Sequence, residues 1–270
     1  MTGDAEKVKS ILEAAPEKVN ARGPKNVAGR MSCIACCTRA SSHRVRRKPN
    51  QTKPYQTPPH PTPPTQRTPL HFGAKGDSTE VVSYLMSIGA DIEARTAYKM
   101  TPLHVAAFYG SAKVMRLLLE EVDDLDINAL DFGSWTSLHY ACNYDWGECA
   151  TLLIEHGASL TKKSAELQLV ALHLAARSGN LSTVERLIAN GCNVSQRNLF
   201  YTTPLHLACQ NDHLDVVRFL LKAGASPDAP DEAGITPAQL TKRDDISQVL
   251  EEAMSVVDRR PAPPPPPPAA

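Results

Sequence analysis

Aromatic side chains are scarce in this sequence, and the features that would place it in a membrane or outside the cell are missing. Phe, Trp and Tyr make up 5% of the 270 residues. No apolar run approaches the roughly 18–20 residues that a bilayer span needs, and the polar start of the chain does not fit a secretory signal. The seven cysteines are odd in number and lack disulfide-like spacing, which favours a reducing compartment. We therefore expect a cytoplasmic or nuclear protein without a membrane segment.

Net charge is also absent, but its distribution is uneven. The 29 basic and 29 acidic side chains cancel. Residues 23–67 hold nine Lys or Arg and no Asp or Glu, so the rest of the chain has 20 basic against 29 acidic residues, a net of −9. An acidic body does not favour nucleic acid by bulk electrostatics. We expect a protein partner instead, and bulk charge predicts basic residues at its rim.

Sequence signatures of catalysis and of cofactor binding are missing as well. The chain has no glycine-rich phosphate loop, nucleophile elbow or metalloprotease helix motif. Cys33, Cys36, Cys37 and His43 supply four possible zinc ligands, but they fall within 11 residues rich in Arg and Pro. Structural zinc sites instead pair two ligand knuckles across a short folded element. We expect no enzyme activity, no metal and no cofactor.

What the sequence does contain is a repeat. Thr-Pro-Leu-His begins at Thr68, returns at Thr101 and again at Thr203, with degenerate copies at Thr136 and Val170 and a sixth start at Thr236. The starts are 33, 35, 34, 33 and 33 residues apart. A fixed period of this length is typical of a solenoid built from small supersecondary units.

Each part of the motif has a physical role at the start or end of a helix. Thr is a good N-cap, and Pro at the first helical position loses no intrahelical hydrogen bond. Apolar residues at helical spacing follow, as in Val114, Leu117 and Leu118. Gly-Ala then ends a second helix, because Gly adopts the left-handed cap conformation without strain. The pattern predicts pairs of helices joined by short loops.

Period and motif together resemble the ankyrin repeat family. The resemblance implies an all-α ankyrin-repeat solenoid, in which stacked helix-turn-helix pairs alternate with hairpin-like fingers. On this register 1–22 is the second helix of a partial first repeat, 23–67 an irregular basic Pro-rich insert and 259–270 a proline-rich tail. The repeats between them are 68–100, 101–135, 136–169, 170–202 and 203–235, followed by a capping repeat at 236–258.

The histidines invite a catalytic interpretation, but five of the nine occupy the fourth motif position. In the family that histidine is a structural hydrogen-bonding residue between neighbouring repeats. We therefore assign the motif residues to structure; they are Thr68, His71, Thr101, His104, Thr136, His139, His173, Thr203 and His206.

The resemblance also indicates where a partner binds, because the family uses fingertips and the ends of first helices on its concave surface. Eight of the chain's 14 aromatic residues fall at or beside these positions. Exposed aromatic clusters are typical of binding sites. The expected partner-binding residues are Tyr98, Met100, Phe108, Tyr109, Phe132, Trp135, Asn143, Tyr144, Arg177, Phe200 and Gln210.

We thus predict a monomeric, non-catalytic scaffold or adaptor that binds a protein. The alternative is a regulatory or substrate-recruiting module of a larger, truncated enzyme or signalling protein. The insert is either a loop or a segment foreign to the fold, such as a retained intron. Its run Arg44–Lys48 matches a nuclear-import or nucleic-acid patch, and the tail prolines fit an aromatic groove of the SH3 type.

Overall fold

The computed structural model of the protein describes residues 66–258, with side chains as far as Ser255. The predicted partial repeat at 1–22, the insert up to residue 65 and the tail at 259–270 lie outside the described residues. Helices come in pairs along the chain. The first helices are α2 (Pro69–Lys75), α4 (Pro102–Tyr109), α6 (Ser137–Asn143), α8 (Ala171–Ser178), α10 (Pro204–Gln210) and α12 (Pro237–Leu240). The second helices are α3 (Thr79–Ser87), α5 (Ala112–Glu121), α7 (Gly147–Glu155), α9 (Leu181–Ala189), α11 (Leu214–Lys222) and α13 (Asp244–Asp258).

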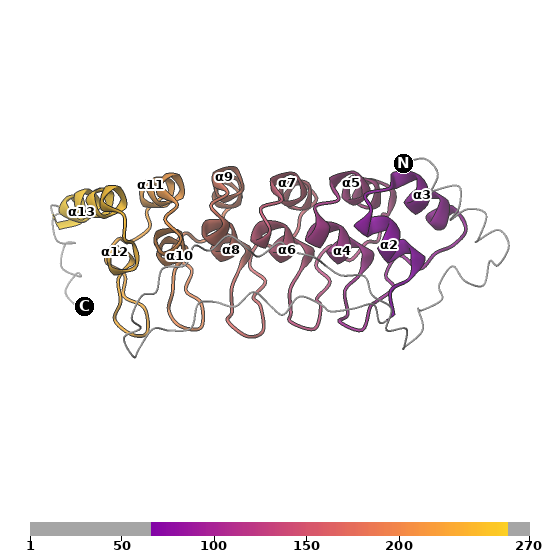
Figure 1. The fold of residues 1–270 in the computed structure, drawn as a ribbon, viewed down its shortest axis with the longest axis horizontal. Helices are drawn as coiled ribbons and strands as arrows, with labels where there is room; N and C mark the ends of the chain where they lie inside the picture. Colours follow the sequence, from indigo (N-terminus) through magenta and orange to yellow (C-terminus); the bar gives the residue numbers. More distant parts are fainter. Residues whose placement is uncertain (1–65, 259–270) are drawn as a thin grey trace, which may run out of the picture.

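These pairs stack into an elongated all-α solenoid (Figure 1). The second helices form one row, the first helices a parallel row below it, and the loops between repeats extend downwards as a row of fingers. No strand occurs between residues 66 and 258. The predicted fold class is therefore confirmed.

The local rules at the helix ends are largely followed. Thr101 and Thr136 accept a hydrogen bond from the amide of the histidine three residues later, while Pro102 and Pro204 occupy the first helical turn. Four second helices are followed, two residues after their last helical residue, by Gly89, Gly157, Gly191 or Gly224, whose φ angles of +80 to +95° are left-handed. Val170 has no hydroxyl, and α8 begins without a side-chain cap.

The motif histidines join each repeat to the next. Nδ1 of His104 accepts from the backbone N–H of Thr101 at 3.2 Å, and its Nε2–H donates to the carbonyl of Trp135 at 3.0 Å. The other four form the same pair of bonds, reaching the carbonyls of Met100, Leu169, Thr202 and Ile235. All five rings are buried. These histidines are structural, since both ring nitrogens are committed to the backbone.

A second set of hydrogen bonds shapes the fingers. The side chain of a polar residue at the start of each finger accepts from the amide of the residue just before the next motif, as Asp131 does from Trp135 at 2.8 Å. Thr96, Ser164, Asn198 and Asp231 do the same. Backbone bonds then link neighbouring fingertips, for example Phe132 N–H to the carbonyl of Tyr98 at 2.9 Å. The fingers are consequently a fixed part of the stack.

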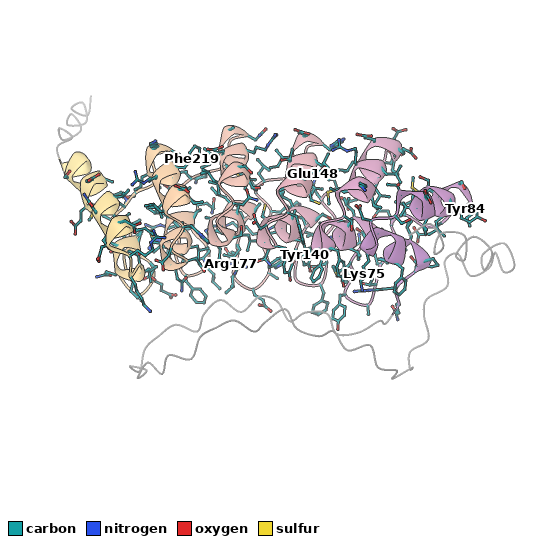
Figure 2. All side chains as sticks on the ribbon, turned by 45° about the horizontal axis from the view of Figure 1, so that its top comes forward. Lys75, Tyr84, Tyr140, Glu148, Arg177 and Phe219 are labelled. Atoms are coloured by element: carbon teal, nitrogen blue, oxygen red, sulfur yellow. The ribbon has the colours of Figure 1, made fainter. Side chains whose placement is uncertain are left out.

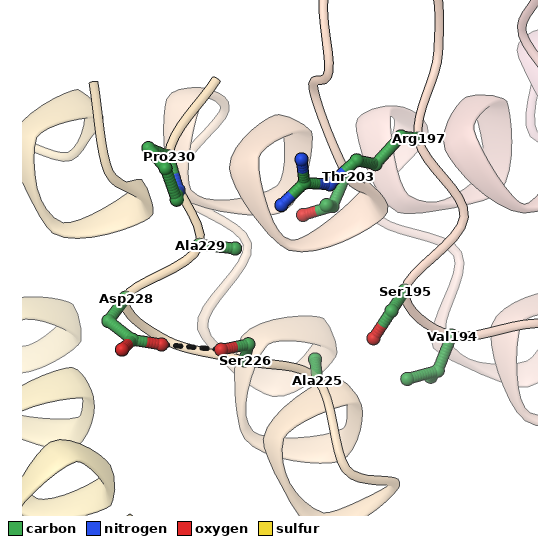
Figure 3. A pocket seen from close by; sticks show the side chains of 9 residues that line it. All are labelled: Val194, Ser195, Arg197, Thr203, Ala225, Ser226, Asp228, Ala229 and Pro230. Atoms are coloured by element: carbon green, nitrogen blue, oxygen red, sulfur yellow. Dashed lines mark hydrogen bonds between the residues drawn. The ribbon is translucent and has the colours of Figure 1, made fainter. Parts of the chain in front are cut away.

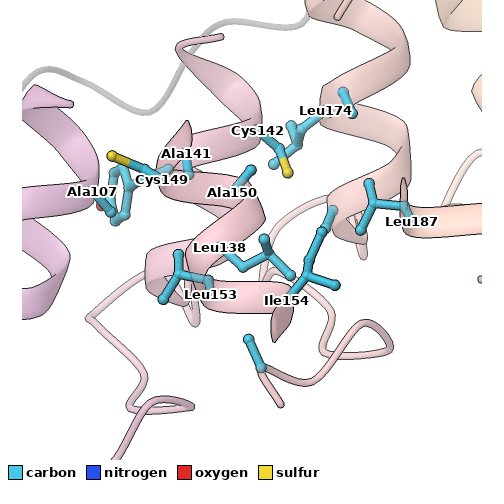
Figure 4. Close-up of a cluster of buried hydrophobic side chains, with 14 of the residues drawn as sticks. Ala107, Leu138, Ala141, Cys142, Cys149, Ala150, Leu153, Ile154, Leu174 and Leu187 are labelled. Atoms are coloured by element: carbon cyan, nitrogen blue, oxygen red, sulfur yellow. The ribbon is translucent and has the colours of Figure 1, made fainter. Parts of the chain in front are cut away.

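One continuous apolar core runs between the two rows of helices. Figure 4 shows part of it, with side chains contributed by α6, α7, α8 and α9. Small residues such as Ala141 and Ala150 are fully buried, which lets the helices of a pair approach closely. Cys142, Cys149 and Cys209 are buried in this core as well.

Candidate protein-binding surface

Three aromatic rings form a cluster at the ends of two adjacent first helices. Phe108 and Tyr109 end α4, and Tyr144 follows the last residue of α6. The ring centre of Phe108 lies 4.9 Å from that of Tyr109 and 4.8 Å from that of Tyr144. All three side chains are half-buried, so each keeps an exposed part. We call Phe108, Tyr109 and Tyr144 the helix-end cluster.

Two cationic side chains border this cluster. The ammonium of Lys75, at the end of α2, lies 5.1 Å from the centre of the Tyr109 ring, a distance at which a cation is attracted to the ring face. On the other side, the guanidinium of Arg177 in α8 donates to the amide oxygen of Asn143. Burial raises the pKa of Tyr144, and the positive charge of Arg177 acts on the same phenol in the opposite direction. Figure 2 shows Lys75 and Arg177 along the row of first helices, on either side of Tyr140.

Tyr140 packs against the Phe108 ring of the cluster. It was not identified from the sequence. Its ring lies 5.6 Å from that of Phe108, and its hydroxyl donates to Oδ2 of Asp131 at 2.5 Å. Oδ1 of the same carboxylate accepts the amides of Gly133 and Trp135. This ties the finger of one repeat to the first helix of the next. Tyr stands here where the equivalent positions hold Phe72, Val105, Leu174 and Leu207, and that contrast is the signal that could have found it.

Met100 and Trp135, which were expected to contact a partner, are buried instead. Their side chains are 3% and 6% exposed. Trp135 packs against Tyr140, with ring centres 5.1 Å apart, and against His139 at 5.8 Å. Each residue directly precedes a motif Thr, and its carbonyl accepts the bond from the preceding motif histidine. That bond draws the position into the stack, so the prediction for these two residues was wrong.

The other fingertip residues of the predicted surface are exposed. Phe132 is 77% exposed, Phe200 42% and Tyr98 41%. Gln210, at the end of α10, is also exposed, while Asn143 is half-buried beneath Arg177. Tyr98 and Phe132 occupy neighbouring fingertips joined by a backbone bond. Together with the helix-end cluster they place apolar surface on the fingers of repeats 68–100 and 101–135 and on the first helices of repeats 101–135 and 136–169.

A separate pocket of about 290 Å³ lies between the loops that follow α9 and α11 (Figure 3). Its polar lining includes Ser195, Arg197 and Asp228. The Asp228 carboxylate accepts a hydrogen bond from Ser226, and the guanidinium of Arg197 lies over the Tyr201 ring at 5.6 Å. The two charged groups of this pocket therefore interact with neighbouring residues of the chain.

Burial controls the ionisation of the cysteines and motif histidines in the described part of the chain. Residues 66–258 contain no group of three or more His, Cys, Asp or Glu side chains that could hold a metal ion. Burial raises the pKa of the Cys149 and Cys209 thiols to about 12 and that of Cys192 to about 11, which leaves almost no thiolate nucleophile at neutral pH. Burial also lowers the pKa of His139 and His173 to about 4.

None of the helices in this part of the chain has the length and hydropathy of a bilayer span. The possible zinc ligands at 33–43 lie outside the described residues.

Paired helices, buried histidines that hydrogen-bond each repeat to the next, and a row of fingers define a class of repeat protein whose modules bind other proteins. The family model described as "Ankyrin repeats (3 copies)" matches residues 48–131, 70–164, 125–198 and 172–241, which together exceed half of the chain. The chain belongs to the ankyrin repeat family, as the motif predicted.

Its relatives are varied. It is 31% identical over 169 residues to human "Transient receptor potential cation channel subfamily A member 1", covering 60% of this chain and 15% of the channel. It is 25% identical over 187 residues to mouse "B-cell lymphoma 3 protein homolog", covering 68% of this chain and 42% of that protein. The chain thus spans less than half the length of these curated relatives.

Solved structures give the same picture. The ankyrin repeat domain of human ASB11 has a TM-score of 0.64 at 26% identity, covering 73% of this chain and 88% of that one. The ankyrin repeat domain of Bcl-3 has a TM-score of 0.61 at 28% identity, covering 68% of this chain and 82% of that one. The chain therefore contains a protein–protein interaction module.

Proposed function

We propose that the protein is a non-catalytic scaffold or adaptor that binds a protein partner on its concave surface. The helix-end cluster, with the fingertips Tyr98 and Phe132, forms the centre of that surface. The observation that carries the proposal is the cluster itself, in which Tyr109 and Tyr144 both pack against Phe108 and all three rings remain partly exposed.

The position of the rings supports this role. Aromatic side chains that serve only the fold become buried, as Trp135 and Tyr140 do. Phe108, Tyr109 and Tyr144 leave apolar area in water, and the fingertip Phe132 is 77% exposed. Aromatic anchors of this kind dominate the binding energy of protein interfaces, because they bury much area at small entropic cost. The hydrogen bonds of Asp131 hold the finger before α6 in place, which keeps the surface preorganised for binding.

The test is an affinity capture with the full chain, followed by mass spectrometry. The variant carries Tyr109→Ala and Tyr144→Ala. The control is Tyr84→Ala, a half-buried tyrosine of α3 in the row of second helices, away from the fingers. We expect proteins captured by the wild type and by the control to be lost from the variant. Truncating such anchors typically lowers affinity by about thirtyfold or more.

Urea unfolding of all three proteins completes the test. The double variant should unfold within about 1 kcal/mol of the wild type, because the changed side chains are partly solvated. If the variant stays folded and still captures every partner, the binding surface lies elsewhere on the chain. If it loses most of its stability, the two rings are structural and the proposal fails.

A second proposal concerns the context of the module. Because the chain matches only 15% of the human channel and 42% of the mouse homolog, it fits a recruiting arm of a larger enzyme or signalling protein. Sequencing the full transcript tests this, since a further domain in frame supports it and flanking stop codons refute it. In either context we propose a monomer that acts in the cytoplasm or nucleus, without nucleic acid or cofactor.

A further inference from the structure

The charges beside the helix-end cluster differ in sign from those of the whole repeat body. Residues 66–258 contain 15 Lys or Arg and 25 Asp or Glu, a net of −10. The ends of the five longer first helices lie at the proposed binding surface. The residues seven and eight positions after each motif start, at or directly after the ends of these helices, are Lys75-Gly76, Phe108-Tyr109, Asn143-Tyr144, Arg177-Ser178 and Gln210-Asn211. Two cations and no carboxylate occur among these ten residues.

Both cations reach towards the repeats that carry the aromatic rings. Lys75 belongs to α2, but its ammonium lies over Tyr109 of α4. Arg177 belongs to α8, but its guanidinium donates to Asn143 of α6. A guanidinium has five N–H donors and can bind a carboxylate with two of them. Each charge is therefore held at one border of the helix-end cluster, within reach of a ligand that covers the rings.

We propose that this surface binds an extended, acidic peptide segment of its partner, with bulky apolar residues over the cluster and a carboxylate at each end. This rests on the proposed function and adds the chemistry of the partner. Bulk charge predicts basic residues at the partner's rim, but Lys75 and Arg177 are the charges that a bound segment contacts. Local charge complementarity sets register and specificity at an interface.

The spacing of the acidic residues follows from the ring distances. Steps of 5.1, 4.9 and 4.8 Å lead from the Lys75 ammonium through Tyr109 and Phe108 to Tyr144. The ammonium is thus at most about 15 Å from the Tyr144 ring, and an extended chain rising about 3.3 Å per residue covers this in about five residues. Arg177 lies beyond Tyr144, so the two carboxylates should be about five or six residues apart.

A selection from random peptides, about twelve residues long so that they exceed this span, tests the inference on the full chain. We expect the enriched peptides to carry Asp or Glu on both sides of aromatic or aliphatic residues. A labelled peptide from this group should bind about tenfold more weakly to Lys75→Glu and to Arg177→Glu, and more weakly at high salt. Lys113→Glu in α5 and Arg218→Glu in α11 make the same charge change on exposed second-helix positions. They should change the affinity less than about twofold.

Several outcomes overturn the inference. They are enrichment of Lys or Arg in the selected peptides, no enrichment at all, equal binding by the charge-reversed and control variants, or a single-stranded oligonucleotide that binds the surface more tightly. If neutral or basic peptides bind and require Tyr109 and Tyr144, the surface stands and only the acidic partner is refuted. Peptides that bind the Tyr109→Ala, Tyr144→Ala variant as well as the wild type refute the proposed surface itself.

Discussion

The indole N–H of Trp146 donates to the carbonyl of Phe108 at 3.2 Å, from one repeat back to the end of the first helix of the repeat before it. The same ring covers Gly110, where an added Cβ would lie 2.5 Å from Cδ2 of the indole. His213 and Gly179 repeat this arrangement two repeats later, with a bond from the imidazole to the carbonyl of Arg177 at 2.9 Å. At these two junctions between neighbouring repeats, a ring thus packs over a glycine. Both junctions adjoin residues of the proposed binding surface, Phe108 and Arg177.

We therefore expect Gly110→Ala to destabilise the protein in two ways. Its φ of +73° is left-handed, which costs a residue with a Cβ about 1–2 kcal/mol, and the Cβ would also displace the indole. Gly89→Ala is the matched control, since φ there is +81° but no atom lies within 4 Å of the added Cβ. In urea unfolding, Gly110→Ala should cost clearly more than Gly89→Ala. Equal costs would show that the indole moves aside freely.

Acid should lower the stability of the fold, because the five motif histidines are buried in their neutral form. Burial holds the pKa of His71, His104 and His206 below the usual 6.5 and lowers that of His139 and His173 to about 4. Between these values the unfolded chain binds protons that the folded chain does not, so stability falls as pH drops from about 6.5 towards 4. Each histidine contributes a slope of up to about 1.4 kcal/mol per pH unit. The check is a series of urea midpoints between about pH 7 and pH 5.

The last repeat has Gln in place of the motif histidine, which suggests a control variant for the urea midpoints at different pH. Gln239 takes the histidine position in the last repeat, and its Oε1 accepts from the Thr236 amide at 3.0 Å. His173→Gln should therefore keep the fold while removing one histidine from the acid dependence. If the variant shows the same loss between about pH 7 and pH 5 as the wild type, His173 is not a source of the effect.

Restoring the Thr-Pro pair of the motif at Val170 and Ala171 should stabilise the repeat that begins there. Val170 offers no cap to α8, and its amide reaches Nδ1 of His173 only at 3.4 Å. Buried prolines stand at the position of Ala171 in α4 and α10, so the site tolerates the ring. Val170→Thr with Ala171→Pro should add about 1 kcal/mol. Hydrogen exchange should show α8 better protected in the variant, and a fall in stability would contradict this.

The helices and the histidine contacts were predictable because they depend on short-range rules that return with each period. Thr, Pro, His and Gly mark the same helix ends in most of the repeats. The assignment of Met100 and Trp135 to the surface failed because their burial depends on a carbonyl, and a backbone acceptor leaves no mark in side-chain identity. The bond between Tyr140 and Asp131 joins two repeats and occurs at one joint, so periodicity does not reveal it. Arg177 was expected at the surface, but its hydrogen bond to Asn143 and the position of Lys75 over the Tyr109 ring were not predicted, because packing across repeats sets these directions.

Trp135 and Tyr144 provide the sharpest separation of folding from binding. Trp135 is 6% exposed and packs between Tyr140 and His139, so Trp135→Ala should lower stability by about 3–5 kcal/mol. Tyr144 is half-buried and packs against Phe108 at the surface, so Tyr144→Ala should cost about 1 kcal/mol or less. Urea unfolding measures both costs, and binding of a selected peptide to the folded proteins measures affinity. Tyr144→Ala should lose binding with little loss of stability, whereas Trp135→Ala should lose stability first. The reverse pattern would place the binding surface on the side of the tryptophan, at the base of the finger.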